Sequence, residues 1–208
     1  MRTIVYVDGF NLYYGALKGT PYKWLDLRAL FTRVLPTGHQ LVKVKYFTAR
    51  VTPLPGDADA PIRQDIYLRA LRAYCGNQIE IIEGHFLTKP LRVPLALQPT
   101  KIVQVLRSEE KGSDVNLAVE LVNDSWSGIF DCAAVVSNDG DLQRAMKIAK
   151  QHLRRKVLLY TPGAPVRKPV MILRRWAHKQ IDILAADLAS SQLPSPIPGT
   201  KIVKPAKW

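Results

Sequence analysis

The sequence predicts an α/β fold in which a mainly parallel sheet carries helices on both faces. Three observations indicate this fold class. Strand-like apolar runs alternate with helical segments along the 208 residues. The first run, residues 2–8, is continuously apolar rather than alternating, as in strands that are covered on both faces. The chain length suits one such domain with a short appendage.

Each element follows from its local pattern. Gly9 permits a turn from the first strand into a helix, Asp26 is suited to cap a second helix ending near Val34, and Gly76-Asn77 ends a third. The strands are expected at residues 2–8, 41–51, 79–87, 132–137 and 156–160. The helices are expected after Gly9, from Asp26 to Val34, from about residue 57 to Gly76, at 113–126 and at 139–151. Because strands and helices alternate, the strands are expected to be parallel.

Two stretches depart from this alternation. Residues 89–108 contain several prolines, and they predict either an inserted hairpin near the ligand-binding edge or a long loop. Residues 188–208 are rich in Pro and Ser and basic near their end, which is typical of a flexible tail. We therefore expect one domain over residues 1–187, followed by a flexible Pro-rich basic tail over residues 188–208.

The charge of the chain favours polyanionic partners. There are 30 Lys and Arg residues against 17 Asp and Glu, a net charge of +13. Such an excess indicates nucleic acid first and an anionic membrane surface second. No apolar stretch approaches the length that spans a bilayer, and no signal peptide is recognisable, so we expect a cytoplasmic protein. Cys75 and Cys132 lack metal-ligand spacing and are expected to be buried free thiols.

Acidic residues follow the predicted strands at their carboxyl ends, where open α/β sheets bind ligands. Asp8 ends the first strand. The segment SNDGDL after the fourth strand places Ser137, Asp139 and Asp141 at the same edge. A further carboxylate, Asp114, shares a helical face with apolar side chains three, four and seven residues later, which aims it inward.

Two interpretations of these carboxylates remain open. Each one alone suits a helix cap or a first helical turn, where the helix dipole stabilises a negative charge. Four carboxylates at one edge of a sheet would repel one another unless a cation offset their charge. Because the cluster contains only oxygen ligands, the favoured ion is Mg²⁺ or Mn²⁺ rather than Zn²⁺.

Three motifs, VDGFNLYYG, EKGSDVNLAVEL and VVSNDGDL, occur in this order over residues 2–160. Together they strongly resemble the NYN domain family, a branch of the PIN-like nuclease superfamily. The resemblance implies a Rossmann-like α/β/α sandwich and an acidic, metal-dependent site that cleaves RNA. By this resemblance Asp8, Asp114, Asp139 and Asp141 are the metal-binding positions. Asn11 would lie beside Asp8, and Ser137 would begin the Ser-x-Asp-x-Asp signature, in which Leu142 replaces the usual aromatic residue.

Three residues are candidates for contact with the substrate. Tyr14 and Lys18 share a helical face with Asn11 and could offer a phosphate an aromatic platform and a cation. Lys111, just before the helix of Asp114, could contact the scissile phosphate. The structural alternatives are a core position for Tyr14 and solvated side chains for Lys18 and Lys111.

The sequence therefore predicts a metal-dependent endoribonuclease that hydrolyses RNA phosphodiester bonds with Mg²⁺ or Mn²⁺. The alternative is a non-catalytic RNA-binding module of the same fold. A haloacid dehalogenase phosphatase would need a second Asp where Phe10 stands, and a nucleotide-binding enzyme would need a Gly-rich loop after the first strand. RNA is the expected partner, a membrane is not, and the oligomeric state is left open.

Overall fold

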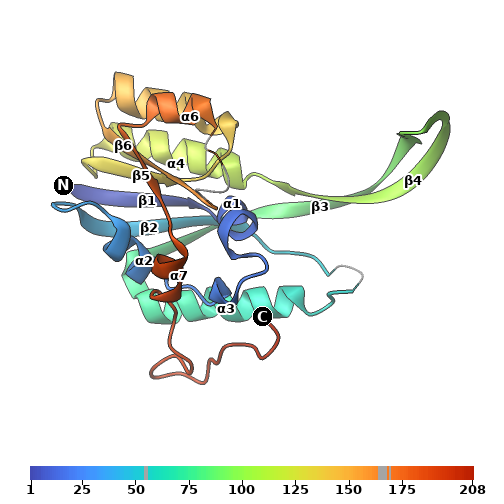
Figure 1. The fold of residues 1–208 in the computed structure, drawn as a ribbon, viewed down its shortest axis with the longest axis horizontal. Coiled ribbons are helices and arrows are strands. Elements are labelled where there is room, and N and C mark those ends of the chain that lie inside the picture. The colour runs from blue at the N-terminus through green and yellow to red at the C-terminus, as the bar shows by residue number, and fades with distance from the viewer. Residues whose placement is uncertain (54–55, 164–167, 169) are drawn as a thin grey trace.

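The computed structural model describes residues 1–53, 56–163, 168 and 170–208. Within them, seven strands form one sheet in the order β4-β3-β2-β1-β5-β6-β7 (Figure 1). The strands are β1 (Arg2–Asp8), β2 (Gln40–Ala49), β3 (Ile79–Leu95), β4 (Gln98–Lys111), β5 (Cys132–Val136), β6 (Lys156–Thr161) and β7 (Lys179–Asp182). All neighbouring strands are parallel except β3 and β4, which are antiparallel. The predicted α/β class with a mainly parallel sheet is confirmed.

Helices cover both faces of the sheet (Figure 1). They are α1 (Gly9–Leu12), α2 (Leu27–Val34), α3 (Ala60–Cys75), α4 (Ser113–Ser127), α5 (Gln143–Lys147), α6 (Met171–Trp176) and α7 (Ala185–Ala189). Short 3-10 or π-helical turns lie at η1 (Tyr13–Leu17), η2 (Pro21–Lys23), η3 (Gly76–Gln78), η4 (Gly140–Leu142) and η5 (Ile148–His152). Among the described helices, none is both long and apolar enough to cross a bilayer.

The strand β1 is buried on both faces, as its continuous apolar run predicts. Val5 and Val7 belong to a core shared with α2, α3 and α7. Ile4 and Tyr6 belong to a second core shared with α4, α5 and α6. The central strand is therefore sandwiched between two helical layers.

The two strands β3 and β4 form a long arm that projects from the body of the domain (Figure 1). β3 pairs with β2 only as far as Gly84, which lies opposite Ala49, and from His85 to Leu95 it pairs with β4. Of the two possibilities for residues 89–108, the hairpin is the one that forms. The arm also makes β3 longer than the predicted strand, which stops at residue 87.

The segment expected to be a flexible tail packs against the domain instead. Leu193 and Ile197 are buried in the core beside α2 and α3. The indole nitrogen of Trp24 donates a hydrogen bond to the carbonyl of Pro194 at 3.2 Å, and the ring of Trp208 meets that of Trp24 edge-on at 5.7 Å. The sequence pattern is misleading here because scattered apolar residues, rather than a periodic face, make the contacts.

A buried ion network that the sequence pattern does not indicate lies between the sheet and α4. The ammonium group of Lys45 on β2 contacts the carboxylates of Glu120 and Asp124, each at 2.6 Å. Asp124 also accepts a hydrogen bond from the hydroxyl of Tyr6 at 2.7 Å. Burial is the largest single effect on the pKa of Lys45 and lowers it, but the hydrogen bonds and charges of Asp124 and Glu120 together raise this pKa above its ordinary value. Lys45 is therefore charged within the core.

The two cysteines are buried and unpaired, as predicted. Burial raises the pKa of the Cys75 thiol to about 12 and that of the Cys132 thiol to about 11. Since the thiolate is the reactive form, we expect neither cysteine of the native protein to react with a thiol reagent at pH 8, while both react after unfolding in guanidinium. Counting modified thiols by mass spectrometry checks this, and rapid modification of the native protein would contradict the burial.

Candidate functional site at the end of β1 and β5

The centre of the sheet is a topological switch point. From β1 the chain adds β2 and β3 on one side, and it later returns to add β5, β6 and β7 on the other. Ligands of open α/β sheets bind outside the carboxyl ends of the strands at such a point. Asp8 is the last residue of β1, and Ser137 directly follows β5. Because Val7 pairs with Val136, the next residues on the two strands lie side by side.

The carboxylate of Asp8 is buried and held by three hydrogen bonds. Its Oδ1 accepts from the backbone N–H of Asn11 at 2.9 Å, so Asp8 caps α1. Its Oδ2 accepts from the side-chain amide of Asn11 at 2.8 Å and from the hydroxyl of Ser137 at 2.9 Å. Asp8 is therefore a helix cap and also a residue of the candidate site, so the cap interpretation and the metal-site interpretation of this carboxylate are not exclusive.

Ser137 links the two acidic segments. Its fully buried hydroxyl donates to Asp8 and accepts from the backbone N–H of Asp139 at 3.1 Å. Asp139 in turn caps the turn η4, since its Oδ1 accepts from the backbone N–H of Asp141 at 3.0 Å. A single hydroxyl thus fixes the relative positions of Asp8 and Asp139.

Burial and charge act together on Asp8. Desolvation is the largest cause that raises the pKa of its carboxyl, the nearby charge of Asp139 raises it further, and the hydrogen bonds from Asn11 and Ser137 partly oppose these effects. The pKa of the buried Tyr46 hydroxyl is raised too, chiefly by burial and further by the charge of Asp8. The site therefore favours a positive charge next to Asp8.

Close packing behind the site requires glycine at position 9. A Cβ atom there would lie 2.7 Å from the carbonyl oxygen of Phe47 and 2.8 Å from the ring of Tyr46. Such contacts are shorter than real Cβ atoms make. Gly9 thus lets α1 start against β2 and places Asn11 beside Asp8.

The metal site predicted at Asp8, Asp114, Asp139 and Asp141 stays a prediction. Among residues 1–53, 56–163, 168 and 170–208, no group of three or more Asp, Glu, His or Cys side chains is placed to hold a metal ion. Asp114 lies near the same edge of the sheet, because α4 starts against Gly84, which pairs with Ala49, the last residue of β2. The Oδ1 of Asp114 accepts a hydrogen bond from the backbone N–H of the next residue, Val115, at 2.8 Å.

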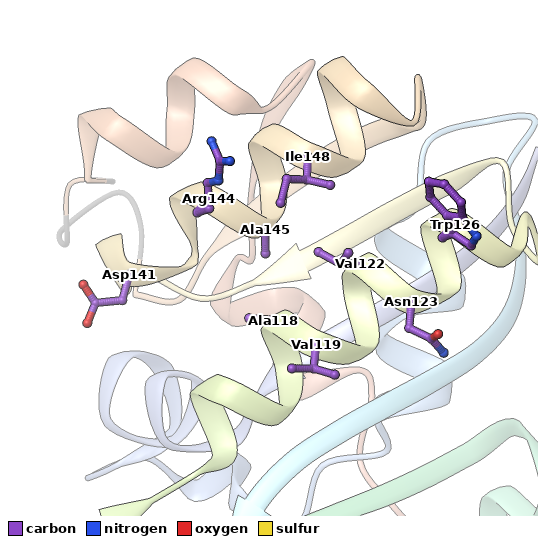
Figure 2. A pocket seen from close by; sticks show the side chains of 9 residues that line it. All are labelled: Ala118, Val119, Val122, Asn123, Trp126, Asp141, Arg144, Ala145 and Ile148. Carbon is purple, nitrogen blue, oxygen red and sulfur yellow. The ribbon is translucent and has the colours of Figure 1, made fainter.

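Asp141 occupies the rim of a groove between α4 and α5, and Figure 2 shows its carboxylate pointing away from the groove lining. The groove has a volume of about 520 Å³. It is lined by Ala118, Val119, Val122, Asn123, Trp126, Asp141, Arg144, Ala145 and Ile148. Since Asp8, Asn11 and Ser137 are not part of this lining, the groove is separate from the hydrogen-bonded site.

The three candidate substrate-binding residues are on the surface. Tyr14 is 61% exposed rather than in the core, and the ammonium group of Lys18 lies 5.0 Å from the centre of its ring. Lys111 is not simply solvated, because its ammonium group contacts the carboxylate of Glu109 at 2.8 Å. A cation and an aromatic ring are thus paired at the turn η1, where Tyr14 lies within the turn and Lys18 ends it.

Asn138 belongs to the site and was not singled out from the sequence. Its backbone N–H donates to the side-chain oxygen of Asn11 at 3.3 Å. Its side chain accepts from the backbone N–H of Val170 at 2.8 Å and donates to the carbonyl of Lys168 at 3.1 Å. Its position between Ser137 and Asp139 in the Ser-x-Asp-x-Asp motif is the sequence feature that could have identified it as a site residue. Asn138 ties the approach to α6 to the site.

The fold and the position of the site define a class of protein. A mostly parallel sheet between two helical layers, with acidic side chains at its switch point, is a PIN-like α/β/α domain. The chain belongs to the NYN domain family, whose model matches residues 2–184.

The chain is also similar to two individual proteins, one by sequence and one by structure. It is 35% identical over 235 aligned positions to 6-hydroxy-3-succinoylpyridine 3-monooxygenase HspA of Pseudomonas putida (strain DSM 28022 / S16). The alignment covers 100% of this chain and 75% of that protein. A crystal structure of VPA0982, a protein of unknown function from Vibrio parahaemolyticus RIMD 2210633, superimposes with a TM-score of 0.58. This match has 21% sequence identity and covers 88% of this chain and 93% of the other, so it supports the fold alone.

Proposed function

We propose that this NYN domain protein hydrolyses RNA phosphodiester bonds as an endoribonuclease that depends on Mg²⁺ or Mn²⁺. The observation that carries the proposal is the position of Ser137 between Asp8 and Asp139 at the switch point of the sheet. Binding of a polyanion alone would not require a buried carboxylate beside a second acidic residue. The net charge of +13 supports RNA as the substrate.

The donor atoms at the site fit a hard divalent cation. Asp8 and Asp139 supply oxygen ligands, and Mg²⁺ is commonly held by one or two carboxylates together with water and substrate phosphates. A cation would also offset the burial and repulsion that raise the pKa of Asp8. Asp114 and Asp141, from the same edge of the sheet, are proposed as further ligands.

Other side chains of the site orient the carboxylate of Asp8 or bind the RNA. Asn11 and Ser137 orient the carboxylate of Asp8 through hydrogen bonds that both donate to its Oδ2. Tyr14, Lys18 and Lys111 bind the RNA chain by stacking and by charge. A bound metal ion would lower the pKa of a water molecule and stabilise the charge that develops on the phosphate.

The test is cleavage of a labelled single-stranded RNA, and of the matched DNA, with Mg²⁺, Mn²⁺ or EDTA. We expect the wild type to cleave RNA only with metal, and Asp139→Asn to lose roughly 100-fold or more of the rate because it weakens the site for the ion. Asp131→Asn is the matched control. It makes the same substitution at the opposite edge of the sheet, in an exposed pair with Arg2, and should retain activity.

Equal rates for Asp139→Asn and Asp131→Asn would refute the proposed site. Thermal melts with EDTA and with Mn²⁺ accompany the assay. Mn²⁺ should stabilise the wild type more than Asp139→Asn, since a ligand that binds only the folded state stabilises it. Metal-independent RNA binding without any cleavage would favour the alternative, a non-catalytic RNA-binding module.

The relative from Pseudomonas favours a second candidate function, oxygenation of a hydroxypyridine. Its similarity extends over the whole of this chain. A monooxygenase transfers one atom of O₂ to its substrate and reduces the other to water, which needs two electrons and two protons from a reductant. The protein should then consume O₂ and a reduced nicotinamide in the presence of 6-hydroxy-3-succinoylpyridine. Product formation in this assay, with no cleavage of RNA, would establish the second function in place of the first.

A further inference from the structure

The β3–β4 arm presents a surface at its tip that none of the described residues covers. Figure 1 shows both strands continuing well beyond the helices that flank the sheet. Leu97 is 97% exposed and Leu106 is 76% exposed. The projecting part of β3, residues 85–95, spans roughly 35 Å at the usual rise of a strand. Because an isolated two-stranded ribbon is only marginally stable in water, an arm of this kind gains from a partner.

Cations lie on both faces of the arm and along its length. Lys89 lies directly opposite Arg107, so both side chains are on one face. Arg92 pairs with Gln104 and points to the other face, because side chains alternate along a strand. Lys101 lies near the tip. A molecule with negative charge on both sides of the ribbon would match this pattern.

The same charges argue against a second copy of the chain as the partner. Residues 85–111 contain five Lys or Arg and two Glu, so two arms would repel each other. On the face of Lys89, Glu109 is already paired with Arg107 and Lys111. Packing the face of Lys89 against another arm would therefore bury cations without a free acidic partner, which is costly.

We propose that the β3–β4 arm holds base-paired RNA by its phosphate backbone, with the arm lying across the wide, shallow minor groove of the RNA duplex. Residues 87–109 contain no aromatic side chain or histidine, so the arm offers no platform for stacking unpaired bases. Duplex RNA is recognised mainly by its shape and by contacts to phosphates and 2′-hydroxyls across the wide minor groove. This inference rests on the proposed function, because it assigns the class of RNA.

The base of the arm adjoins the candidate site. Phe86 meets Phe10 of α1 edge-on, with ring centres 5.7 Å apart. Phe10 lies between Asp8 and Asn11 in the chain. A duplex held along the arm would therefore reach the edge of the sheet where Asp8 and Ser137 lie.

The test measures binding in EDTA, so that it does not depend on cleavage. Fluorescence anisotropy is recorded with a labelled 20-base-pair RNA duplex and with its single strand as probes. For Lys89→Gln/Arg92→Gln/Arg107→Gln we expect roughly a tenfold or greater loss of duplex affinity, and a decrease of about 2–3 in the slope of log affinity against log salt. The loss of affinity for the single strand should be smaller.

The control variant removes three exposed cations away from the arm, Lys179→Gln/Lys201→Gln/Lys207→Gln, and should bind the duplex within roughly threefold of the wild type. A second arm variant replaces residues 90–106 with Asn-Gly, a two-residue turn suited to join Lys89 and Arg107, and should lose duplex binding as well. Melting curves of all variants check that each is folded.

Equal losses in the arm variant and the control variant would overturn the proposal, as would tighter binding of the single strand by the wild type. A dimer in sedimentation that the arm variants lose, together with unchanged RNA affinity, would also overturn it and identify a second copy as the partner. Arm-dependent duplex binding without cleavage in Mg²⁺ or Mn²⁺ would support the arm while refuting the proposed nuclease. If the arm variants cleave RNA and bind the duplex as well as the wild type does, the proposed nuclease is supported and the role of the arm is refuted.

Discussion

Replacing Lys45 with Met is expected to lower the free energy of unfolding by about 3–5 kcal/mol, because it leaves the buried carboxylate of Asp124 without its cation. The side chains of Lys45 and Asp124 are only 7% and 6% exposed, so water cannot replace the lost partner. Urea unfolding of the wild type and the variant measures the difference. The effect is large because the cost comes from an uncompensated charge rather than from a lost contact.

Lys43→Met is the matched control for this prediction. Lys43 lies two residues earlier on the same strand, and its pair with Glu80 is 38% and 42% exposed. An exposed pair contributes about 0–1 kcal/mol, so this variant should be nearly as stable as the wild type.

A combined variant, Tyr6→Phe/Lys45→Met/Asp124→Leu, removes the two charges and the hydroxyl that meet at Asp124, and should recover much of the lost stability. Similar losses for Lys43→Met and Lys45→Met would show that the network is not the cause.

The second large effect is expected on removal of residues 190–208. The deletion takes away Leu193 and Ile197, two core side chains that each contribute about 1.5–3 kcal/mol when buried, so a loss of about 3–6 kcal/mol follows. It also leaves the indole N–H of Trp24 without the carbonyl of Pro194. Thermal unfolding followed by circular dichroism measures the change.

A shorter deletion separates the contributions within this segment. Removing only residues 204–208 keeps Leu193 and Ile197 and loses the contacts of Trp208 with Trp24 and Tyr67. The loss should then be distinctly smaller than for the longer deletion. A full deletion that melts like the wild type would mean that the segment is the flexible tail its composition indicates.

Much of the candidate site could be predicted because it depends on local order in the chain. A strand that ends in Asp, and a second strand followed by Ser-x-Asp, bring their polar side chains together once the strands are neighbours. Asp8, Ser137 and Asp139 needed only the strand positions and the parallel arrangement. Asn138 was within reach as well, since it lies inside the same motif.

Asp114 could not be placed in the same way. Its position depends on where α4 begins, and that start is set by the end of the β3–β4 arm and by Gly112, whose φ of 94° few other residues adopt. The helical face was predicted well, since Leu117 and Leu121 are buried. The distance from Asp114 to Asp8, however, depends on how the intervening strands β2, β3 and β4 are placed relative to β1.

Local sequence patterns were enough to predict the α/β class, nearly all the bounds of the strands β1, β2, β5 and β6, and the carboxylates at the ends of β1 and β5. These features follow from local periodicity and from the short range over which glycine and caps act. The strand order, the hydrogen bonds from Ser137 to Asp8 and from Asp139 to Ser137, the charged Lys45 in the core and the packing of residues 190–208 against Trp24 depend on contacts between distant segments. Hydrogen bonds and packing require distances of a few ångströms between such segments, and a local pattern does not fix these distances.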